Sequence, residues 1–239
     1  MNNWLEKFKG FATQFWDGIC FWAYPESCLV CSFQLPSNVH FVCASCRADL
    51  PFTFFENSTT PTSLDKLFWG RVTLESTFAL FAFEQNNATQ KLLHQLKYKN
   101  KPQLGIFLGE MIASRLTNTV GIDFLLPVPL HSKKQYKRGY NQSEQLAIGL
   151  SNRWNVQVNT SVLLRVQNAE SQTKQGRFGR WGNVAEAFSC LNGAALENKH
   201  IALIDDVTTT GATLEACVKL LQKEIKGIKI SVICLAVTV

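Results

Sequence analysis

The stretch Ile201-Ala-Leu-Ile-Asp-Asp-Val-Thr-Thr-Thr-Gly-Ala-Thr213 decides the fold of the chain. Its first four residues are apolar, which predicts a buried parallel strand that ends in two acids, Asp205 and Asp206. Residues 207–211 predict a short turn, and residues 212–221 have the apolar spacing of a helix. This arrangement predicts a phosphate site, because backbone N–H groups and the positive end of the helix dipole converge at such a turn.

The paired acids make the expected ligand more specific. Two carboxylates beside a phosphate would repel it unless they bind something else, such as sugar hydroxyls or a metal ion. They also lie at the carboxyl end of the strand, where open α/β sheets bind their ligands. The pattern therefore favours a sugar phosphate, and the alternative is an ordinary strand-to-helix turn with two solvated acids.

The same residues resemble the signature of the phosphoribosyltransferase family, in which four apolar residues and two acids precede a Thr/Gly-rich loop. The resemblance implies that Asp205 and Asp206 bind the ribose hydroxyls of phosphoribosyl pyrophosphate (PRPP), with Mg²⁺ on the pyrophosphate side. The loop would wrap the 5′-phosphate. The implied PRPP-binding residues are Asp205, Asp206, Val207, Thr208, Thr209, Thr210, Gly211, Ala212 and Thr213.

The composition is that of a chain that buries a core. Of its 239 residues 46% are hydrophobic, which predicts one medium-sized domain and a smaller unit. The net charge of +6 permits a polyanionic partner without requiring one. Residues 1–20 lack the continuous apolar core of a signal peptide, and no later run is long enough to span a bilayer.

We therefore expect a cytoplasmic protein without stable membrane insertion, which partners could hold at the inner face of the membrane. The aromatic residues within residues 1–20 favour packing on the rest of the chain. An amphipathic helix that docks on a membrane-bound partner is the alternative.

Two Cys-x-x-Cys pairs predict a metal site. The pairs are Cys28 with Cys31 and Cys43 with Cys46. Four thiolates at this spacing predict a closed structural Zn²⁺ site, which would stabilise a segment too short for its own core. A redox dithiol and an iron–sulfur cluster ligand set are the alternatives. We expect His40 at the surface, and Cys217 and Cys234 as buried, inert thiols.

Apolar patterns predict the remaining organisation. We expect an N-terminal helix and zinc ribbon over residues 1–56, a linker over 57–69 and a phosphoribosyltransferase-like domain over 70–239. A helix over 88–99 would face its leucines inward and Lys91, Lys97 and Lys99 outward. Further helices are expected over 104–116 and 144–154, with strands within 71–83 and near Asp123, Val156, Ile201 and Ile228. Alternating strands and helices predict a mostly parallel α/β sheet flanked by helices, and the resemblance implies the type I phosphoribosyltransferase-like form.

A rigid turn and a basic loop follow the strand near Asp123. Pro127-Val-Pro129 lacks two N–H donors, and Ser132-Lys-Lys-Gln-Tyr-Lys-Arg138 carries four positive charges. A basic loop at the carboxyl end of a strand could hold pyrophosphate, and a solvated loop is the alternative. The residues that we assign to pyrophosphate are Pro129, Leu130, His131 and Arg138.

As a set, these motifs resemble the ComF family of competence-associated proteins. The set comprises the two cysteine pairs, Pro127-Val-Pro-Leu-His131, Arg138-Gly-Tyr-Asn-Gln142, the polar segment 167–183 and the acid-pair loop. The resemblance implies a phosphoribosyltransferase-type fold fused to a zinc ribbon, and a role in natural transformation, where incoming single-stranded DNA is handled. It places His131, Arg138, Asn141 and Gln142 in the first ligand loop, and Gln172, Arg180 and Asn183 in a mobile loop.

The segment 167–183 is polar and basic and has no clear period, which is typical of a functional lid. A closing basic lid would exclude water and hold the departing pyrophosphate. Arg180 therefore joins Asp205 and Asp206 as an expected catalytic residue, whereas Trp181 could stack on a DNA base. The expected DNA-binding residues are Lys133, Lys134, Lys137, Arg138 and Trp181.

Three functions follow from these observations. The first is a PRPP-binding protein that binds incoming single-stranded DNA and passes it to a competence helicase or a recombination mediator. The second is an enzyme that transfers phosphoribose to an acceptor that the sequence does not identify. The third is a nucleotide-salvage phosphoribosyltransferase, which is less favoured because such catalysis does not require a metal ribbon.

Overall fold

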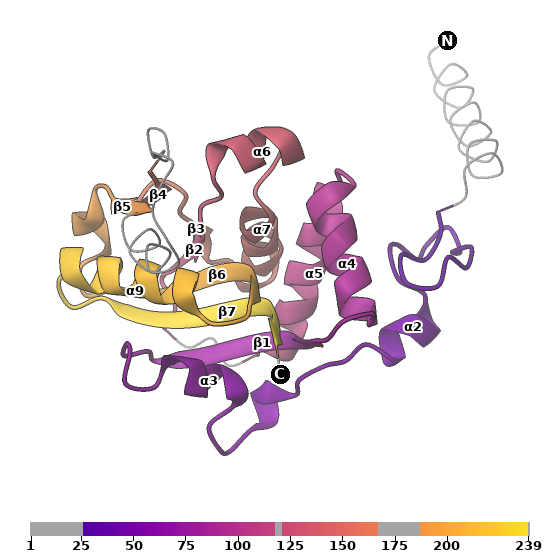
Figure 1. The fold of residues 1–239 in the computed structure, drawn as a ribbon, viewed down its shortest axis with the longest axis horizontal. Coiled ribbons are helices and arrows are strands. Elements are labelled where there is room, and N and C mark those ends of the chain that lie inside the picture. Colours follow the sequence, from indigo (N-terminus) through magenta and orange to yellow (C-terminus); the bar gives the residue numbers. More distant parts are fainter. Residues whose placement is uncertain (1–25, 118–120, 167–186, 239) are drawn as a thin grey trace, which may run out of the picture. The chain divides into compact units, whose positions relative to one another are not determined.

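The structure is a computed structural model that describes residues 26–117, 121–166 and 187–238 (Figure 1). The chain divides after Leu50 into two compact units, Met1–Leu50 and Pro51–Val239. The helix expected within residues 1–20 lies outside the described residues. Among the described residues, no helix is both long and apolar enough to cross a membrane.

The first unit is organised by short turns around the cysteine pairs. An antiparallel bridge joins Ser27 to Gln34, and the N–H of Leu29 donates to the carbonyl of Phe41. The helix α2 (Ala44–Ala48) begins after Cys43, whose side chain accepts from the N–H of Cys46. These contacts fold the segment between the two pairs back on itself.

The second unit contains a five-stranded parallel sheet. Its strand order is β1-β7-β6-β2-β3, so that β6 is central and β7 lies between β1 and β6 (Figure 1). The strands are β1 (Ser76–Phe83), β2 (Phe124–Pro127), β3 (Gln157–Val158), β6 (His200–Thr208) and β7 (Lys229–Thr238). The predicted parallel sheet is therefore confirmed.

Helices cover both faces of this sheet. In β7, Ile230, Val232 and Cys234 pack into one core cluster with α3 (Ser63–Phe68) and α9 (Ala212–Glu224). The alternate residues of β7 are also buried, because parallel strands between two layers of helices are covered on both sides. The other layer contains α5 (Pro102–Arg115) and α7 (Gln142–Trp154), which pack against each other, together with α4 (Ala88–Tyr98).

The crossing of α5 and α7 depends on glycine. A Cβ added at Gly149 would lie 2.1 Å from the carbonyl oxygen of Ile106, and one at Gly109 would lie 2.2 Å from that of Leu146. The two backbones can therefore approach this closely only without side chains at these positions. This contact fixes α7, whose first turn faces the end of β6.

Residues 51–69 pack on β1. The sequence predicted a linker for part of this segment, residues 57–69. Phe52 forms a bridge with Phe81, and η1 (Phe55–Asn57) follows it. The helix α3 begins with a capping box in which Thr62 and Asp65 exchange hydrogen bonds. Asp65 also accepts from the hydroxyl of Thr77 in β1 at 2.7 Å, so the helix is joined to the sheet.

The basic segment after β2 differs from the sequence prediction of a loop. It forms a short helix, α6 (Ser132–Arg138), because the ring of His131 accepts from the N–H of Lys133 and Gly139 ends the helix at a φ of +81°. Two further strands, β4 (Leu163–Arg165) and β5 (Phe188–Cys190), pair antiparallel. The expected mobile loop, 167–183, lies outside the described residues, and η3 (Gly193–Leu196) precedes β6.

Candidate functional site

The loop after β6 joins a strand to a helix, as predicted, with a shorter turn. The strand continues through both acids to Thr208, so that only residues 209–211 separate it from α9. Gly211 has a φ of +74° and precedes α9 without any side-chain cap. The N–H groups of the first helical turn therefore have no partner within the helix and no capping side chain. This end of α9 is available to a phosphate.

Arg71 fixes the loop from the side of α3. Its guanidinium donates to the carbonyls of Leu67 at 2.7 Å and Thr210 at 3.0 Å, and it forms an ion pair with Glu215 in the first turn of α9. The hydrogen bond from Lys219 and the contacts with Arg71 lower the pKa of Glu215, although burial opposes them. Sequence reasoning missed Arg71, because the contact joins residues far apart in the chain.

The two acids of β6 have different surroundings. Asp205 accepts from the hydroxyl of Ser143 at 3.1 Å and from the N–H of Asp206 at 2.8 Å. Burial and the neighbouring charge of Asp206 raise the pKa of Asp205 to about 7, although Ser143 and Lys97 oppose the shift. Asp205 is therefore close to half protonated at neutral pH, and a bound cation would favour its charged form.

Asp206 forms an ion pair with Lys97 at the end of α4. Lys97 Nζ lies 3.0 Å from Asp206 Oδ2, and the two side chains are 19% and 14% exposed. The sequence pattern predicted that Lys97 faces solvent, and this prediction was wrong. Lys97 points toward the sheet because the largely buried carboxylate of Asp206 in β6 pairs with it. Neither Lys97 nor Ser143 was assigned to the site from the sequence.

The exit from β2 brings the predicted first ligand loop to the same edge of the sheet. The amide of Asn141 donates to the carbonyl of Val128 at 3.0 Å and accepts from the N–H of Ser143. Arg138 donates to the side chain of Gln142 at 2.6 Å. Because Ser143 also contacts Asp205, the start of α7 links the basic helix α6 to the acid pair.

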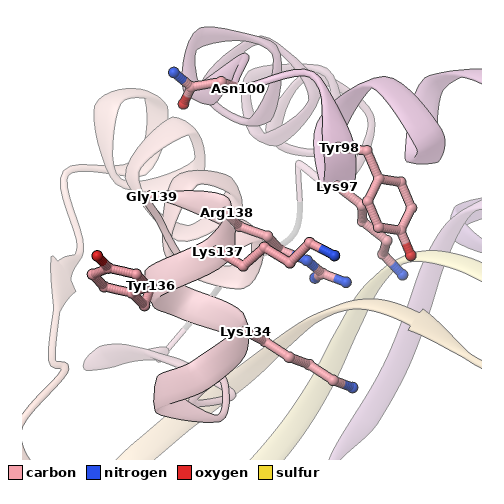
Figure 2. A pocket seen from close by; sticks show the side chains of 8 residues that line it. All are labelled: Lys97, Tyr98, Asn100, Lys134, Tyr136, Lys137, Arg138 and Gly139. Atoms are coloured by element: carbon pink, nitrogen blue, oxygen red, sulfur yellow. The ribbon is translucent and has the colours of Figure 1, made fainter.

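A cavity of about 530 Å³, which we call the basic pocket, lies between α4 and α6. Its lining residues are Lys97, Tyr98, Asn100, Lys134, Tyr136, Lys137, Arg138 and Gly139. Figure 2 shows that Lys134, Lys137 and Arg138 extend from α6 toward Lys97 and Tyr98, whereas Tyr136 points to the other side of α6. Of the expected DNA-binding lysines, the lining set contains Lys134 and Lys137 but not Lys133.

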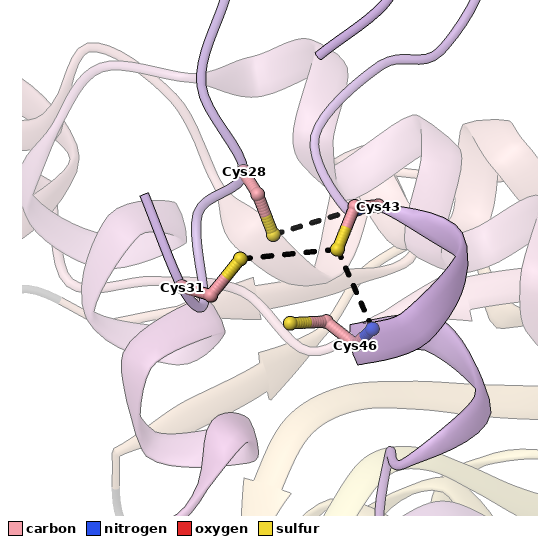
Figure 3. Close-up of side chains that lie close together, drawn as sticks. All are labelled: Cys28, Cys31, Cys43 and Cys46. Atoms are coloured by element: carbon pink, nitrogen blue, oxygen red, sulfur yellow. Dashed lines mark hydrogen bonds between the residues drawn. The ribbon is translucent and has the colours of Figure 1, made fainter. Parts of the chain in front are cut away.

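The cysteine pairs of the first unit form one cluster, as predicted. Their four Sγ atoms all lie within 4.8 Å of one another, and those of Cys31 and Cys43 are 3.8 Å apart (Figure 3). Tetrahedral Zn²⁺ with Zn–S bonds of about 2.3 Å places its sulfur ligands roughly 3.8 Å apart. The donor set and its spacing therefore fit a structural zinc ion.

The ionisation of these thiols also fits a cation site. Burial opposes ionisation of Cys28, but hydrogen bonds from the backbones of Cys31, Cys43 and Val30 outweigh it and lower the pKa to about 6. Hydrogen bonds with the neighbouring thiols raise the pKa of Cys46 to about 12, and the largest contribution comes from Cys31. All four thiols can be ionised at the same time only when a bound cation offsets their negative charges.

The other sequence predictions have mixed outcomes. His40 is exposed and pairs with Glu26 at 3.0 Å, and Cys217 and Cys234 are buried, as expected. Burial raises the pKa of both thiols, which keeps them protonated. The remaining expected site residues, Gln172, Arg180, Trp181 and Asn183, lie outside the described residues.

The class of protein follows from the sheet and the loop on its central strand. The chain has a type I phosphoribosyltransferase-like parallel α/β sheet flanked by helices, with a four-cysteine cluster in its first unit. A purine phosphoribosyltransferase from Pyrococcus horikoshii matches 56% of this chain and 72% of its own, at 18% identity and a TM-score of 0.35. A hypoxanthine phosphoribosyltransferase from Staphylococcus aureus matches 63% of this chain and 71% of its own, with a TM-score of 0.32. At such scores the fold class rests on the strand order and the loop.

The sequence relatives are more specific. Competence protein F of Haemophilus influenzae is 35% identical over 139 residues, or 55% of this chain and 61% of that protein. The DNA utilization protein YhgH of Escherichia coli K12 is 28% identical over 54% of this chain and 59% of its own. Competence protein ComFC of Bacillus subtilis is 32% identical over 45% of this chain and 41% of its own. No family model matches the chain.

Each of these alignments covers less than two thirds of the relative. Over about half of its length, the chain is similar in sequence to competence protein F and to the DNA utilization protein YhgH. The resemblance predicted from the sequence motifs is thereby confirmed for that part of the chain.

Proposed function

We propose that the protein binds PRPP with Mg²⁺ at the end of β6 and acts on single-stranded DNA in natural transformation. One observation carries the first half of this proposal: an uncapped helix N-terminus lies directly beside two carboxylates. A simple phosphate would be repelled by the acids, whereas a sugar phosphate offers hydroxyl groups to them. The ligand class is therefore an activated ribose phosphate.

Each part of the ligand has a partner in this proposal. The N–H groups of residues 209–213 bind the 5′-phosphate, and Asp205 and Asp206 accept hydrogen bonds from the ribose hydroxyls. The pyrophosphate lies toward His131 and Arg138, at the carboxyl end of the neighbouring strand β2. Bound Mg²⁺ offsets the negative charge of the pyrophosphate.

The DNA half of the proposal is supported by charge and by the relatives. The helix α6 presents Lys133, Lys134 and Lys137 to solvent, and two of the relatives are named as a competence protein and a DNA utilization protein. Such a face binds phosphodiesters through counterion release. In the cell, this protein would receive the incoming strand in the cytoplasm and pass it to a competence helicase or a recombination mediator.

Thermal denaturation tests the PRPP site. PRPP with Mg²⁺ raises the melting temperature of the zinc-loaded protein, because the ligand binds only the folded state. The paired substitution Asp205→Ala and Asp206→Ala abolishes that rise, whereas Lys223→Gln on the far end of α9 leaves it intact. A rise of equal size in the double variant contradicts the assignment of the site.

A salt titration tests DNA binding. Binding of a single-stranded oligonucleotide weakens as salt increases, with a smaller slope when Lys134 and Lys137 are replaced by Gln. A binding constant that does not respond to salt contradicts the phosphate contacts.

Phosphoribosyl transfer is a second candidate function, including the transfer to a free base in nucleotide salvage. The raised pKa of Asp205 favours it, because a carboxyl group that titrates near neutral pH can accept or donate a proton. Pyrophosphate release with single-stranded DNA, nucleosides and bases as acceptors tests it. Release that depends on one acceptor identifies an enzyme, and release with none contradicts phosphoribosyl transfer to these acceptors.

A further inference from the structure

The basic pocket has the features of a ligand site that neither the acid pair nor the α9 loop explains. Pro129, Leu130 and His131, which are assigned to pyrophosphate, do not line it, and Arg138 alone is shared. Within the described part of the chain, no carboxylate lies at ion-pair distance from Lys134, Lys137 or Arg138. Three cations therefore face one cavity without a protein counter-charge, which strongly favours an anionic ligand.

The cavity also offers an aromatic surface. Tyr98 is 60% exposed, and the guanidinium of Arg138 lies 5.4 Å from the centre of its ring. A planar base can stack on an exposed tyrosine while lysines hold its phosphate, and such stacking tolerates every base. The volume of about 530 Å³ is within the range of small-ligand sites. The lining chemistry thus matches a nucleoside phosphate better than a bare inorganic anion.

Lys97 belongs to the basic pocket and to the acid pair at once. Lys97 lines the cavity (Figure 2). Its ammonium nitrogen also lies 3.0 Å from Asp206 Oδ2. An anion in the pocket competes with Asp206 for this one cation. A sugar or a divalent cation that binds Asp206 in turn releases Lys97 to the pocket. Because such coupling is reciprocal, each ligand should strengthen the binding of the other.

We propose that the basic pocket is a second ligand site, for a nucleoside phosphate, and that Lys97 couples its occupancy positively to ligand binding at the acid pair. The nucleoside phosphate is either a free nucleotide or one residue of a single DNA strand. The coupling half of this inference rests on the proposed PRPP site, and a DNA strand as the source of the ligand rests on the proposed DNA binding, but a nucleoside phosphate in the pocket requires neither. The two are therefore tested separately.

The pocket is tested first without PRPP. Thymidine 5′-monophosphate and a short single-stranded oligothymidylate are titrated into the zinc-loaded full chain. Lys134→Gln with Lys137→Gln weakens binding about tenfold or more, because both phosphate-facing charges are lost. Tyr98→Ala also weakens binding, and Tyr98→Phe restores it by keeping the ring. Lys223→Gln is the matched control and changes the affinity less than twofold.

The two probes separate the sources of the ligand. If the mononucleotide binds as tightly as the oligonucleotide, the ligand is a free nucleotide. If only the oligonucleotide binds, the ligand is a DNA strand. Either result supports the site, provided that the pocket variants reduce it. Binding of neither probe, or binding that the pocket variants leave unchanged, overturns the proposal.

The coupling is tested by a double-mutant cycle that needs no PRPP. Asp206→Asn releases Lys97 and tightens binding of the pocket ligand by about fivefold. In a Lys97→Met background the same change has a clearly smaller effect, and the difference measures the coupling through Lys97. Equal effects in both backgrounds overturn the coupling.

PRPP then gives the functional readout. With Mg²⁺, it strengthens nucleotide binding in the wild-type protein and leaves it unchanged in Lys97→Met. If PRPP instead displaces the nucleotide, the pocket is only the pyrophosphate end of the first site and the proposal is wrong. If PRPP does not bind at all, the proposed function fails, while the titrations above still decide the pocket.

Discussion

The two units of the chain are stabilised by different means. Residues 26–50 contain one five-residue helix and a cluster of four cysteines, whereas residues 51–238 enclose a parallel sheet that is buried on both faces. A metal ion can replace a core in the first unit, because it binds only the folded ligand arrangement. The described part of the second unit buries an apolar core around its sheet, so we expect it to fold without a metal. The comparison teaches that metal ligands and apolar burial stabilise different parts of this chain, and four predictions test the two means of stabilisation.

Metal removal has the largest expected effect. A chelator should abolish amide hydrogen-exchange protection across residues 26–50, because the folding free energy of this segment comes from the metal. The sheet strands β6 and β7 should keep theirs. Cys43→Ser should have the same effect as chelation, and Cys190→Ser, a half-buried thiol outside the cluster, should not. Unchanged protection of residues 26–50 without metal would contradict this account.

Asp205 gives the sheet unit a pH dependence of its own. Its pKa of about 7 exceeds the value of about 3.9 expected for an unfolded chain, so the folded state binds the extra proton between these values. The contribution of this group to the free energy of unfolding therefore falls as pH rises, by about 2 to 3 kcal/mol from pH 5 to pH 8. Urea denaturation of wild type and Asp205→Asn at both pH values measures it. A pH dependence that the substitution leaves unchanged would show that Asp205 titrates normally.

The packing of α5 on α7 should be sensitive to a single methyl group. Gly149→Ala places a Cβ 2.1 Å from the carbonyl oxygen of Ile106, which should destabilise the protein by about 1 to 3 kcal/mol despite the better helix propensity of Ala. Asn152→Ala, an exposed site on the same helix, provides the control and should be neutral or slightly stabilising. A stabilised Gly149→Ala protein would mean that the helices are farther apart.

The capping box of α3 should give the smallest effect. Thr62→Ala removes the side-chain acceptor for the N–H of Asp65 and should lower the free energy of unfolding by about 1 kcal/mol. Thr62→Ser keeps a hydroxyl acceptor and should lose little of this stability. The free energy of unfolding from denaturant titration measures both. Equal losses for Ala and Ser would attribute the effect to the methyl group of Thr62 and not to the cap.

Local patterns predicted the elements that bury apolar residues at a regular period. The strand before Asp205 and the helix after Gly211 were predicted in this way, and so were α4, α5 and α7. The metal cluster was predicted because Cys-x-x-Cys spacing is itself a geometric constraint. The Thr62-x-x-Asp65 pattern was also a readable signal for α3, although it lies in the segment assigned to a linker.

The sequence could not predict contacts that join distant residues. The basic helix α6 has no apolar period, so only the cap from His131 and the stop at Gly139 indicate it. The orientation of Lys97 depends on Asp206, which is far away in the chain, and local periodicity therefore placed it at the surface. Arg71 and Ser143 join the site in the same way.

The most direct test is calorimetric titration of PRPP with Mg²⁺ into the zinc-loaded full chain at pH 8, where Asp205 is mostly ionised. We expect one saturable site, which weakens as pH falls through 7 and which is lost in Asp205→Ala with Asp206→Ala. A folded, metal-loaded protein that shows no heat of binding would contradict the central claim, and so would binding that does not depend on the two acids.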